Sequence, residues 1–440
     1  MQRSFCSRCQ LSQNTAGMKK NKSIRLAILL FAVLPVTFSA CLKDKCRGSQ
    51  TYTWYEPVYK SKTEVRANIK SNAPKNLVNT GKIYLYGNYI FLNEIDKGVH
   101  IIDNSNPAQP KNMAFIDLPG NMDIAVKDNI LYADLYTDLI AIDITNPASI
   151  SVKKIVDGVF PERAYGGGFY PTNAADQVIV DWIRHDSTVK GECDKAFYPP
   201  IRSGAPIFFA NAAAGTNTAA SPVGVGGSMA RFTIVNDYMY GVERHTLKVI
   251  SISNPADPVL INDIFAGFDI ETIYPFKDKL FLGSMIGMFI FDISTPVNPV
   301  KVGEFVHARA CDPVIADDNY AYVTLREGKS CGPAANELHV VNIQNLQSPS
   351  LSKTYPMSGP AGLSKDNNLL FICDGADGLK VYDATDPANL HLVKRIGGLE
   401  TYDVIAYNKR AILVAKNGIY QYDYSNPANI YEVSKLTIQK

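Results

Sequence analysis

The sequence lacks the short signatures that place a nucleophile, a metal ion or a nucleotide in a known geometry. G-x-S-x-G, H-E-x-x-H, the P-loop and the dinucleotide fingerprint are all missing from its 440 residues. Its six histidines are scattered, and His100, His339 and His391 lie inside strand-like runs, where a structural role is expected. We therefore predict no catalytic residues, no metal site and no cofactor.

Basic charge is also scarce in the part of the chain that folds. Residues 1–40 hold six Lys and Arg and no acid, so the rest has 38 basic against 42 acidic residues, a balance of −4. A nucleic-acid binder needs a basic surface that displaces counterions from phosphates, so the composition argues against this class. With 46% hydrophobic residues, the chain is too apolar for intrinsic disorder.

A secretion signal is present at residues 18–41. A basic segment precedes an apolar run at 26–36, which is too short to span a bilayer comfortably. Residues 1–17 precede this basic segment and its own Met18, and we interpret them as a spurious extension of a signal peptide that ends at residue 40. Small residues before Cys41 resemble a bacterial lipobox.

The lipobox resemblance implies that Cys41 is diacylated, becomes the new N-terminus and is then N-acylated. Several acyl chains give durable anchoring, whereas one does not. Residue 42 is Leu rather than Asp, so retention in the inner membrane is not signalled. We therefore expect a bacterial cell-envelope protein, lipid-anchored in the outer membrane, with residues 41–65 as a tether. Ordinary signal-peptidase cleavage beside an incidental cysteine is the alternative.

One pattern recurs seven times. Each copy is an apolar strand that usually closes on Asp, followed by Ser or Thr, a polar residue and Pro, as in GVHIIDNSNPAQP at 98–110. The key position falls at Asp103, Asp143, Ser251, Asp292, Asn342, Asp383 and Asp423. An Asp before Ser-Asn-Pro accepts hydrogen bonds from turn amides, and Pro presets the bend. We therefore interpret these residues as turn staples rather than as a functional ring of carboxylates.

The spacing of the copies predicts the fold. The intervals between key positions are 40, 108, 41, 50, 41 and 40 residues, and each period of about 40 holds four short strand-like runs. The third run is often apolar on both faces, as at 139–142, which suits a sheet packed between two neighbours. We predict an all-β fold over residues 66–440: a single β-propeller, most simply of seven four-stranded blades.

The repeats resemble the LVIVD family, over roughly residues 79–440. The resemblance implies a propeller on a bacterial or archaeal cell-envelope protein, and it implies no catalytic residues. The copies that end in Ser251 and Asn342 depart from the Asp of the pattern, which weakens the turn chemistry at those two positions.

Two insertions interrupt the repeat. The longer lies at about 158–227 and includes a strand-like VIVDWI at 178–183 and a small-residue tract at 211–227, typical of a flexible loop. A concealed eighth blade is the alternative. The shorter insertion is 326–337. In an up-and-down blade, the loop between strands 2 and 3 and the link to the next blade leave from one face. We therefore expect both insertions at the face where each innermost strand begins, and we predict that this face binds a partner.

Charged and aromatic residues are expected at the same face. They are Asp123, Arg163, Phe169, Tyr170, Trp182, Arg231, Glu271, Arg309, Asp312, Tyr402 and Asp403. A mouth of mixed charge with aromatic side chains suits a polar ligand or a peptide. A solvated rim whose charges neutralise one another is the alternative.

These observations favour a non-enzymatic, lipid-anchored propeller that binds an envelope protein or a glycan. A hydrolase or lyase that acts on a polymer through Asp123, Glu271, Asp312 or Asp403 is the second hypothesis, and a purely architectural envelope component is the third. Cys311 and Cys331 are the expected disulfide, with Cys193 and Cys373 as rival partners, because both predicted positions lie at one face of the fifth blade.

Overall fold

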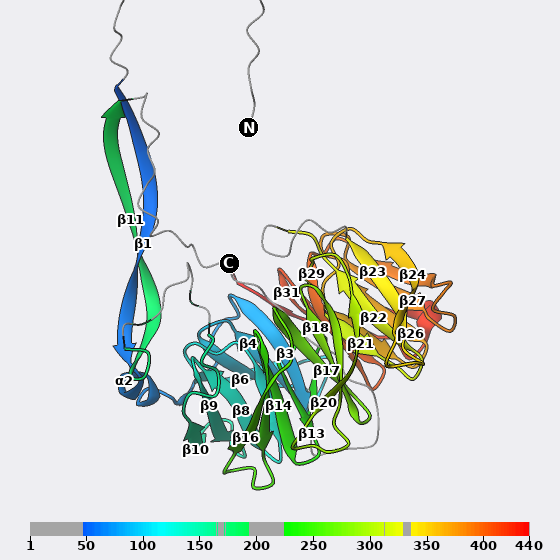
Figure 1. Ribbon diagram of the computed structural model, residues 1–440, viewed down its shortest axis with the longest axis horizontal. Helices are drawn as coiled ribbons and strands as arrows, with labels where there is room; N and C mark the ends of the chain where they lie inside the picture. The colour runs from blue at the N-terminus through cyan, green and yellow to red at the C-terminus, as the bar shows by residue number, and fades with distance from the viewer. Residues whose placement is uncertain are drawn as a thin grey trace, which may run out of the picture. The chain divides into compact units, whose positions relative to one another are not determined.

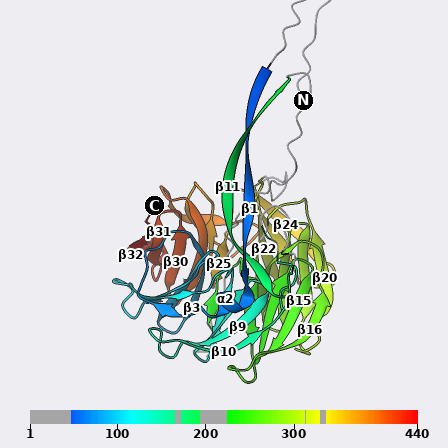
Figure 2. The ribbon, with the colours of Figure 1, turned by 90° about the vertical axis from the view of Figure 1, so that its left-hand side faces the viewer.

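The computed structural model describes residues 47–163, 165, 171, 173–192, 224–311, 313–328 and 336–439. Within these ranges, seven antiparallel sheets of four consecutive strands follow one another in chain order around a ring (Figure 1, Figure 2). The predicted all-β fold, a β-propeller with seven four-stranded blades, is confirmed. Because blade 2 packs directly against blade 3 in one buried cluster, the alternative of a concealed eighth blade between them is wrong.

The blades are built as follows, from the innermost to the outermost strand. Blade 1 has β3 (Thr80–Tyr86), β4 (Tyr89–Glu94), β5 (Gly98–Asp103) and β6 (Lys111–Asp117), with β12 (Val225–Gly226) added inside and β2 (Ser71–Asn72) outside. Blade 2 has β7 (Ile124–Lys127), β8 (Ile130–Leu135), β9 (Asp138–Asp143) and β10 (Ser151–Val156). Blade 3 has β13 (Phe232–Val235), β14 (Tyr238–Glu243), β15 (Thr246–Ser251) and β16 (Val259–Phe265). Blade 4 has β17 (Ile270–Phe276), β18 (Lys279–Ser284), β19 (Gly287–Asp292) and β20 (Val300–Val306).

The last three blades follow without further additions to their sheets. Blade 5 has β21 (Val314–Ala316), β22 (Tyr320–Leu325), β23 (Glu337–Asn342) and β24 (Ser350–Pro356). Blade 6 has β25 (Leu363–Asp366), β26 (Leu369–Cys373), β27 (Leu379–Asp383) and β28 (His391–Ile396). Blade 7 has β29 (Thr401–Tyr407), β30 (Arg410–Ala415), β31 (Gly418–Asp423) and β32 (Tyr431–Thr437), with the short η3 (Pro427–Asn429) before its last strand.

The hydrophobic core lies between neighbouring blades. In β9, the consecutive residues Leu139, Ile140, Ala141 and Ile142 are all fully buried, because this strand packs against a blade on each side. The outermost strands are exposed by contrast, as in β10, whose first three residues face solvent. The continuous apolar runs of the sequence are thus the third strands of the blades.

The repeated turn forms as predicted. The Oδ1 atom of Asp143 accepts a hydrogen bond of 2.9 Å from the amide of Thr145, and Asn342 makes the same bond with Gln344 at 3.0 Å. The same staple forms at Asp103, Asp292, Asp383 and Asp423. Ser251 departs from it, and its hydroxyl bonds to that of Ser253. The hydrogen bonds with Thr145 and the nearby Lys153 lower the pKa of Asp143 to about 2.

These turns also join neighbouring blades. The hydroxyl of Tyr132 in blade 2 donates to the carbonyl of Pro255 in the turn of blade 3, at 2.8 Å. Tyr240 does the same to Pro296 in blade 4 at 3.0 Å. Pro255 and Pro296 therefore shape their own turns and also present their carbonyls to the preceding blade.

The ring closes by side-chain packing and hydrogen bonds rather than by a swapped strand. All four strands of blade 7 come from the C-terminal part of the chain, as predicted. Ile83 and Ile405 belong to the one apolar cluster between blades 1 and 7. Across the same junction, the Gln421 amide donates to Asn104 Oδ1 at 2.6 Å.

A two-stranded ribbon pairs the tether with the long insertion. β1 (Arg47–Ser61) runs beside β11 (Gln177–Glu192), which contains the strand-like run expected at 178–183 (Figure 1). Residues 47–53 and 186–192 of this ribbon form a compact unit of their own, whereas 54–61 and 177–185 belong to the unit that contains the propeller.

The short helix α2 (Lys62–Arg66) connects the ribbon strand to blade 1. Ser61 caps it through a capping box with Glu64. Lys62 and Arg66 each lie 2.7 Å from a carboxylate oxygen of Asp138, at the start of β9. The side chain of Asp138 is only 2% exposed. These two ion pairs tie the helix to blade 2.

Candidate binding face and channel

Five of the predicted residues lie at or just before the first residues of innermost strands. Asp123 and Arg231 immediately precede β7 and β13, and Glu271, Tyr402 and Asp403 lie at the starts of β17 and β29. We call this side of the ring the insertion face. Trp182 lies on β11 rather than on an innermost strand, and Arg309 lies in the link before β21. Phe169, Tyr170, Asp312, Cys331 and Cys41 lie outside the described residues.

The end of the long insertion runs through the centre of the ring. The Gly224 amide donates to Val126 O of blade 2 at 3.0 Å, and β12 then pairs with β3 of blade 1. Ser228 Oγ accepts from the Leu363 amide of blade 6 at 2.8 Å. The carbonyl of Ala230 accepts from the Ile273 amide of blade 4 at 2.8 Å. Residues 224–230, which we call the channel plug, thus contact the innermost strands of four blades.

The plug requires small residues because atoms of blade 1 lie very close to its backbone. A Cβ on Gly224 would lie 2.3 Å from Cε1 of Tyr84 and 2.4 Å from the carbonyl oxygen of Leu85. A Cβ on Gly226 would lie 3.2 Å from the ring of Tyr84. The interpretation of the tract 211–227 as a flexible loop is therefore wrong for its last residues, 224–227. They are small because the channel is narrow.

Asp123 is a structural tie between three blades. Its Oδ2 accepts from Lys82 Nζ of blade 1 at 3.0 Å, from the Phe232 amide of blade 3 at 3.1 Å, and from the Arg231 amide. Its side chain is 3% exposed and that of Lys82 is 8% exposed. A carboxylate oxygen with this many donors has little capacity left for a substrate.

Arg163 fastens the start of the long insertion to blades 1 and 2. Its guanidinium donates to Asp96 Oδ1 at 2.6 Å and to the carbonyl of Gly120 at 2.5 Å, and it lies 3.5 Å from Asp134 Oδ2. It also lies over the ring of Tyr136, 5.1 Å from the centroid. With only 8% of its side chain exposed, Arg163 is part of the framework.

Two carboxyl groups are buried without such donors. Asp403 and Glu243 are each 2% exposed, and none of their carboxyl oxygens has a hydrogen-bond partner among the described residues. Burial raises the pKa of Asp403 to about 7, against the opposing effects of the Val404 amide and Lys82. Burial likewise raises the pKa of Glu243 to about 7, although Lys248 Nζ lies 3.7 Å away.

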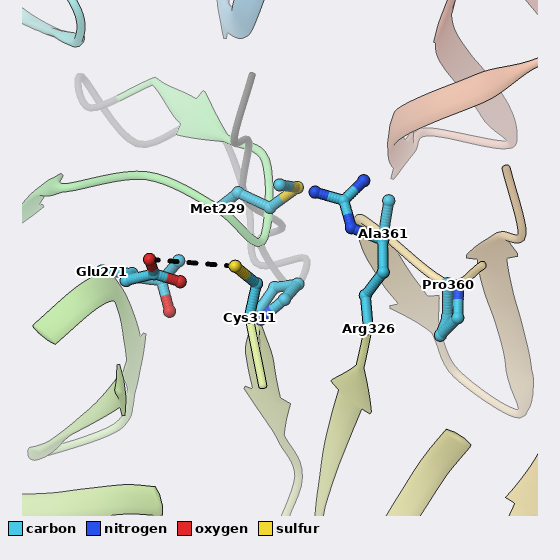
Figure 3. A pocket seen from close by; sticks show the side chains of 8 residues that line it. Met229, Glu271, Cys311, Arg326, Pro360 and Ala361 are labelled. Atoms are coloured by element: carbon cyan, nitrogen blue, oxygen red, sulfur yellow. Dashed lines mark hydrogen bonds between the residues drawn. The ribbon is translucent and has the colours of Figure 1, made fainter. Parts of the chain in front are cut away.

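A small pocket opens beside the channel plug at blades 4 to 6. Glu271 and Arg326 line it from different sides, with Cys311 between them and Met229 of the plug above (Figure 3). The rest of the lining is Thr272, Pro313, Pro360 and Ala361. Its volume is about 10 Å³, which is room for roughly one water molecule.

Cys311 holds the short insertion against this pocket. Its backbone exchanges hydrogen bonds of 3.3 and 3.1 Å with that of Arg326, and its sulfur is in a disulfide. Cys373 is a free, buried thiol, so it is not the partner. Cys331 and Cys193 lie outside the described residues, and the pairing of Cys311 with Cys331 stays a prediction.

The outer rim of the insertion face combines charge with exposed apolar side chains. Asp269 pairs with Arg309 at 3.1 Å and with Arg244 at 3.4 Å. Beside them, Phe265 is 63% exposed and Phe268 is 58% exposed, and their rings pack edge to face with centroids 5.4 Å apart. The rim at blades 3 to 5 thus combines charged and aromatic side chains, and its aromatic residues are the two phenylalanines rather than Trp182.

Several residues of this face escaped prediction. Lys82, Asp134, Glu243 and Arg326 lie in or at the ends of strands rather than at the predicted strand starts. Lys82 carries the one available signal, because it is a lysine within an otherwise uncharged strand, TGKIYLY. The exposed Phe265 and Phe268 were hidden among other apolar residues of an outermost strand and its link.

Within the described part of the chain, no three His, Cys, Asp or Glu side chains are grouped so that they could hold a metal ion. No helix in those ranges is long and apolar enough to cross a membrane.

Comparison with known proteins agrees with the repeat pattern. The LVIVD repeat model matches residues 79–116, 120–158 and 226–264, which are blades 1 to 3. No curated protein matches the chain.

Similar solved structures include three proteins at low identity. The computationally designed Ika8 protein is 10% identical, with a TM-score of 0.48, 84% of this chain and 92% of that chain covered. The dihydro-heme d1 dehydrogenase NirN is 12% identical, with a TM-score of 0.47, and the coverages are 83% and 67%. PorZ of Porphyromonas gingivalis, a surface component of the type-IX secretion system, is 11% identical, with a TM-score of 0.45, and the coverages are 82% and 39%.

These scores are too low to argue from any one neighbour. The closed ring of blades, the six stapled turns and the repeat match over blades 1 to 3 together carry the assignment. The chain is a seven-bladed β-propeller whose first three blades match the LVIVD repeat.

Proposed function

We propose that this protein is a lipid-anchored binding module of the bacterial cell envelope that holds a protein or glycan partner at its insertion face. The observation that carries the proposal is the rim, where exposed Phe265 and Phe268 adjoin the Arg244–Asp269–Arg309 ion pairs. Exposed aromatic side chains beside charged groups are typical of binding surfaces.

The arrangement of the insertion supports this choice of face. Glu162, at the start of the long insertion, lies 2.9 Å from His245 Nδ1, and His245 in turn packs edge to face on Phe268. The insertion is therefore connected to the rim by direct contacts. A repeat that is regular elsewhere carries its irregular elements on this one side, where function concentrates in such scaffolds.

The lipid anchor rests on the sequence. The basic segment, the short apolar run and the small residues before Cys41 support acylation of that cysteine, and Leu42 supports export to the outer membrane. The Cys41→Ser variant is expected to move from the membrane fraction to the soluble fraction. A wild-type protein that is soluble, or a mature N-terminus other than acylated Cys41 in mass spectrometry, contradicts the anchor.

Charge reversal at the rim tests the binding face. Crosslinking in intact cells with the Arg244→Glu, Arg309→Glu double variant, and separately with Phe265→Ser, Phe268→Ser, is expected to lose the partner recovered with the wild type. Lys277→Glu is the matched control, because Lys277 is 62% exposed in a turn between the first two strands of blade 4, on the other side of the ring. An unchanged crosslinked partner in both rim variants refutes the proposed face.

The hydrolase or lyase alternative finds less support in the geometry. Asp123 and Asp403 are each 2% exposed, which prevents contact with a polymer. Asp312 lies outside the described residues. Glu271 has the raised pKa, about 7, that suits a general acid, but it lines a pocket of about 10 Å³, too small for a sugar ring. Binding at the rim therefore accounts for more of the site.

A further inference from the structure

The pocket beside the channel plug is lined by an acidic and a basic side chain, Glu271 and Arg326, which do not form an ion pair with each other. Figure 3 shows the guanidinium of Arg326 and the carboxyl of Glu271 on different sides of it. Neither group forms an ion pair with the other or with another described residue. This differs from Arg163, which is paired with Asp96 and Asp134 a few blades away.

The side chain of Arg326 is partly buried, and its guanidinium has no hydrogen-bond acceptor among the described residues. Burial lowers the pKa of this guanidinium, which Glu271 only partly opposes. At Arg163, by contrast, burial lowers the pKa but the charges of Asp96 and Asp134 oppose it, and the net shift is upward. Arg326 is thus an unused anion-binding group.

Glu271 supplies a hydrogen-bond donor beside it. Its Oε1 lies 4.0 Å from the sulfur of Cys311, which is in a disulfide and has no proton to donate. Burial raises the pKa of Glu271 to about 7, with Arg326, Arg309 and Lys82 lowering it and Asp269 raising it. Near neutral pH, a large fraction of Glu271 is therefore protonated and can donate to an anion on Arg326.

The size and lining of the pocket restrict what enters it. A volume of about 10 Å³ has room for roughly one atom group of the size of a water molecule. Met229, Pro313, Pro360 and Ala361 provide apolar walls. One carboxylate oxygen fits a space of this size beside the Arg326 guanidinium and leaves one further oxygen to be satisfied. A phosphate has up to three further oxygens, for which these apolar walls offer no donor.

We propose that the pocket formed by Glu271, Arg326 and Met229 binds a single carboxylate group, presented either by a small free acid or by the C-terminal end of a chain. The carboxylate accepts from the guanidinium of Arg326 and from protonated Glu271. The proposal deepens the binding role proposed for the insertion face, since the pocket lies at that face. It does not depend on the rim residues.

Ligand-observed NMR on the purified full chain tests this pocket at constant ionic strength. The probes are acetate, trialanine and trialanine amide, and the amide lacks the terminal carboxylate. We expect acetate and trialanine to bind and the amide not to bind. The Arg326→Gln variant is expected to weaken binding roughly tenfold or more, the loss typical of a charged hydrogen bond. Arg410→Gln, which removes an arginine paired with Asp423 at 2.8 Å in blade 7, is the matched control and should bind as the wild type does.

The Glu271→Gln variant gives an independent readout. It keeps a donor but removes the titration, so binding should persist and lose its weakening above about pH 7. Tighter binding of trialanine than of acetate identifies a chain end as the ligand, and the reverse identifies a free acid. Failure of both probes to bind the wild type, or equal losses in Arg326→Gln and Arg410→Gln, overturns the proposal. Since partner crosslinking depends on Arg244, Arg309, Phe265 and Phe268, either result can fail without the other.

Discussion

Replacing Asp403 with Asn removes a buried acid while keeping the shape of the side chain. Asp403 is 2% exposed, and its carboxyl oxygens have no hydrogen-bond partner in the described ranges. Its pKa is raised by burial from 3.8 to about 7. The folded protein therefore holds a proton on Asp403 between about pH 4 and pH 7 that the unfolded chain has released. The free energy of unfolding of the wild type falls as pH rises through this window.

The structure sets the size of this effect. A shift of about three pKa units corresponds to roughly 4 kcal/mol, at about 1.4 kcal/mol per unit, and this is an upper limit. Asp403→Asn is free of this penalty. Its advantage over the wild type should grow with pH between about pH 4 and pH 7 and reach roughly 2–4 kcal/mol at pH 8. Chemical unfolding followed by circular dichroism at pH 5 and pH 8 measures the change.

Asp143→Asn is the matched control, because it makes the same substitution at an ionised, hydrogen-bonded carboxylate whose pKa is about 2. Its stability relative to the wild type should not improve as pH rises. If Asp403→Asn is no more stable than the wild type at pH 8, or if its advantage is the same at pH 5, Asp403 has an ionic partner and the reasoning from burial is wrong.

Three further predictions concern the plug, the turns and the disulfide. Gly224→Ala should destabilise the protein by about 1–3 kcal/mol in thermal unfolding, because its Cβ meets Tyr84 and Leu85, whereas Gly359→Ala enters open space and should cost less; equal effects would contradict a filled channel. Asp143→Ala should cost about 1 kcal/mol by loss of the turn staple, and a similar loss in Asp143→Asn would show that the hydrogen bond to Thr145 is unimportant. Non-reducing peptide mapping should recover Cys311 joined to Cys331, and recovery of Cys311 joined to Cys193 would refute that pairing.

The repeat could be predicted because its causes are local. Each turn depends on an Asp or Asn and the amide two residues later, as at Asp143 and Thr145, so the pattern is visible in a short window of sequence. Third strands that are buried on both faces leave continuous apolar runs, and their spacing of about 40 residues indicates one blade per copy. The number of blades follows from counting these copies. The position of the insertion face follows from the alternating directions of the strands within a blade.

The tertiary structure decided what the charged and small residues do. Asp123 forms an ion pair with Lys82, 41 residues away, and accepts a hydrogen bond from the Arg231 amide, 108 residues away. Ser228 meets Leu363 across 135 residues, so a tract with the composition of a flexible loop becomes the channel plug. Composition and periodicity describe a residue and its neighbours in sequence. Hydrogen bonds and desolvation depend instead on which distant strands the closed ring brings together. The closed ring therefore decided that Asp123 has partners from other blades, whereas Glu271 and Arg326 face a pocket without forming an ion pair.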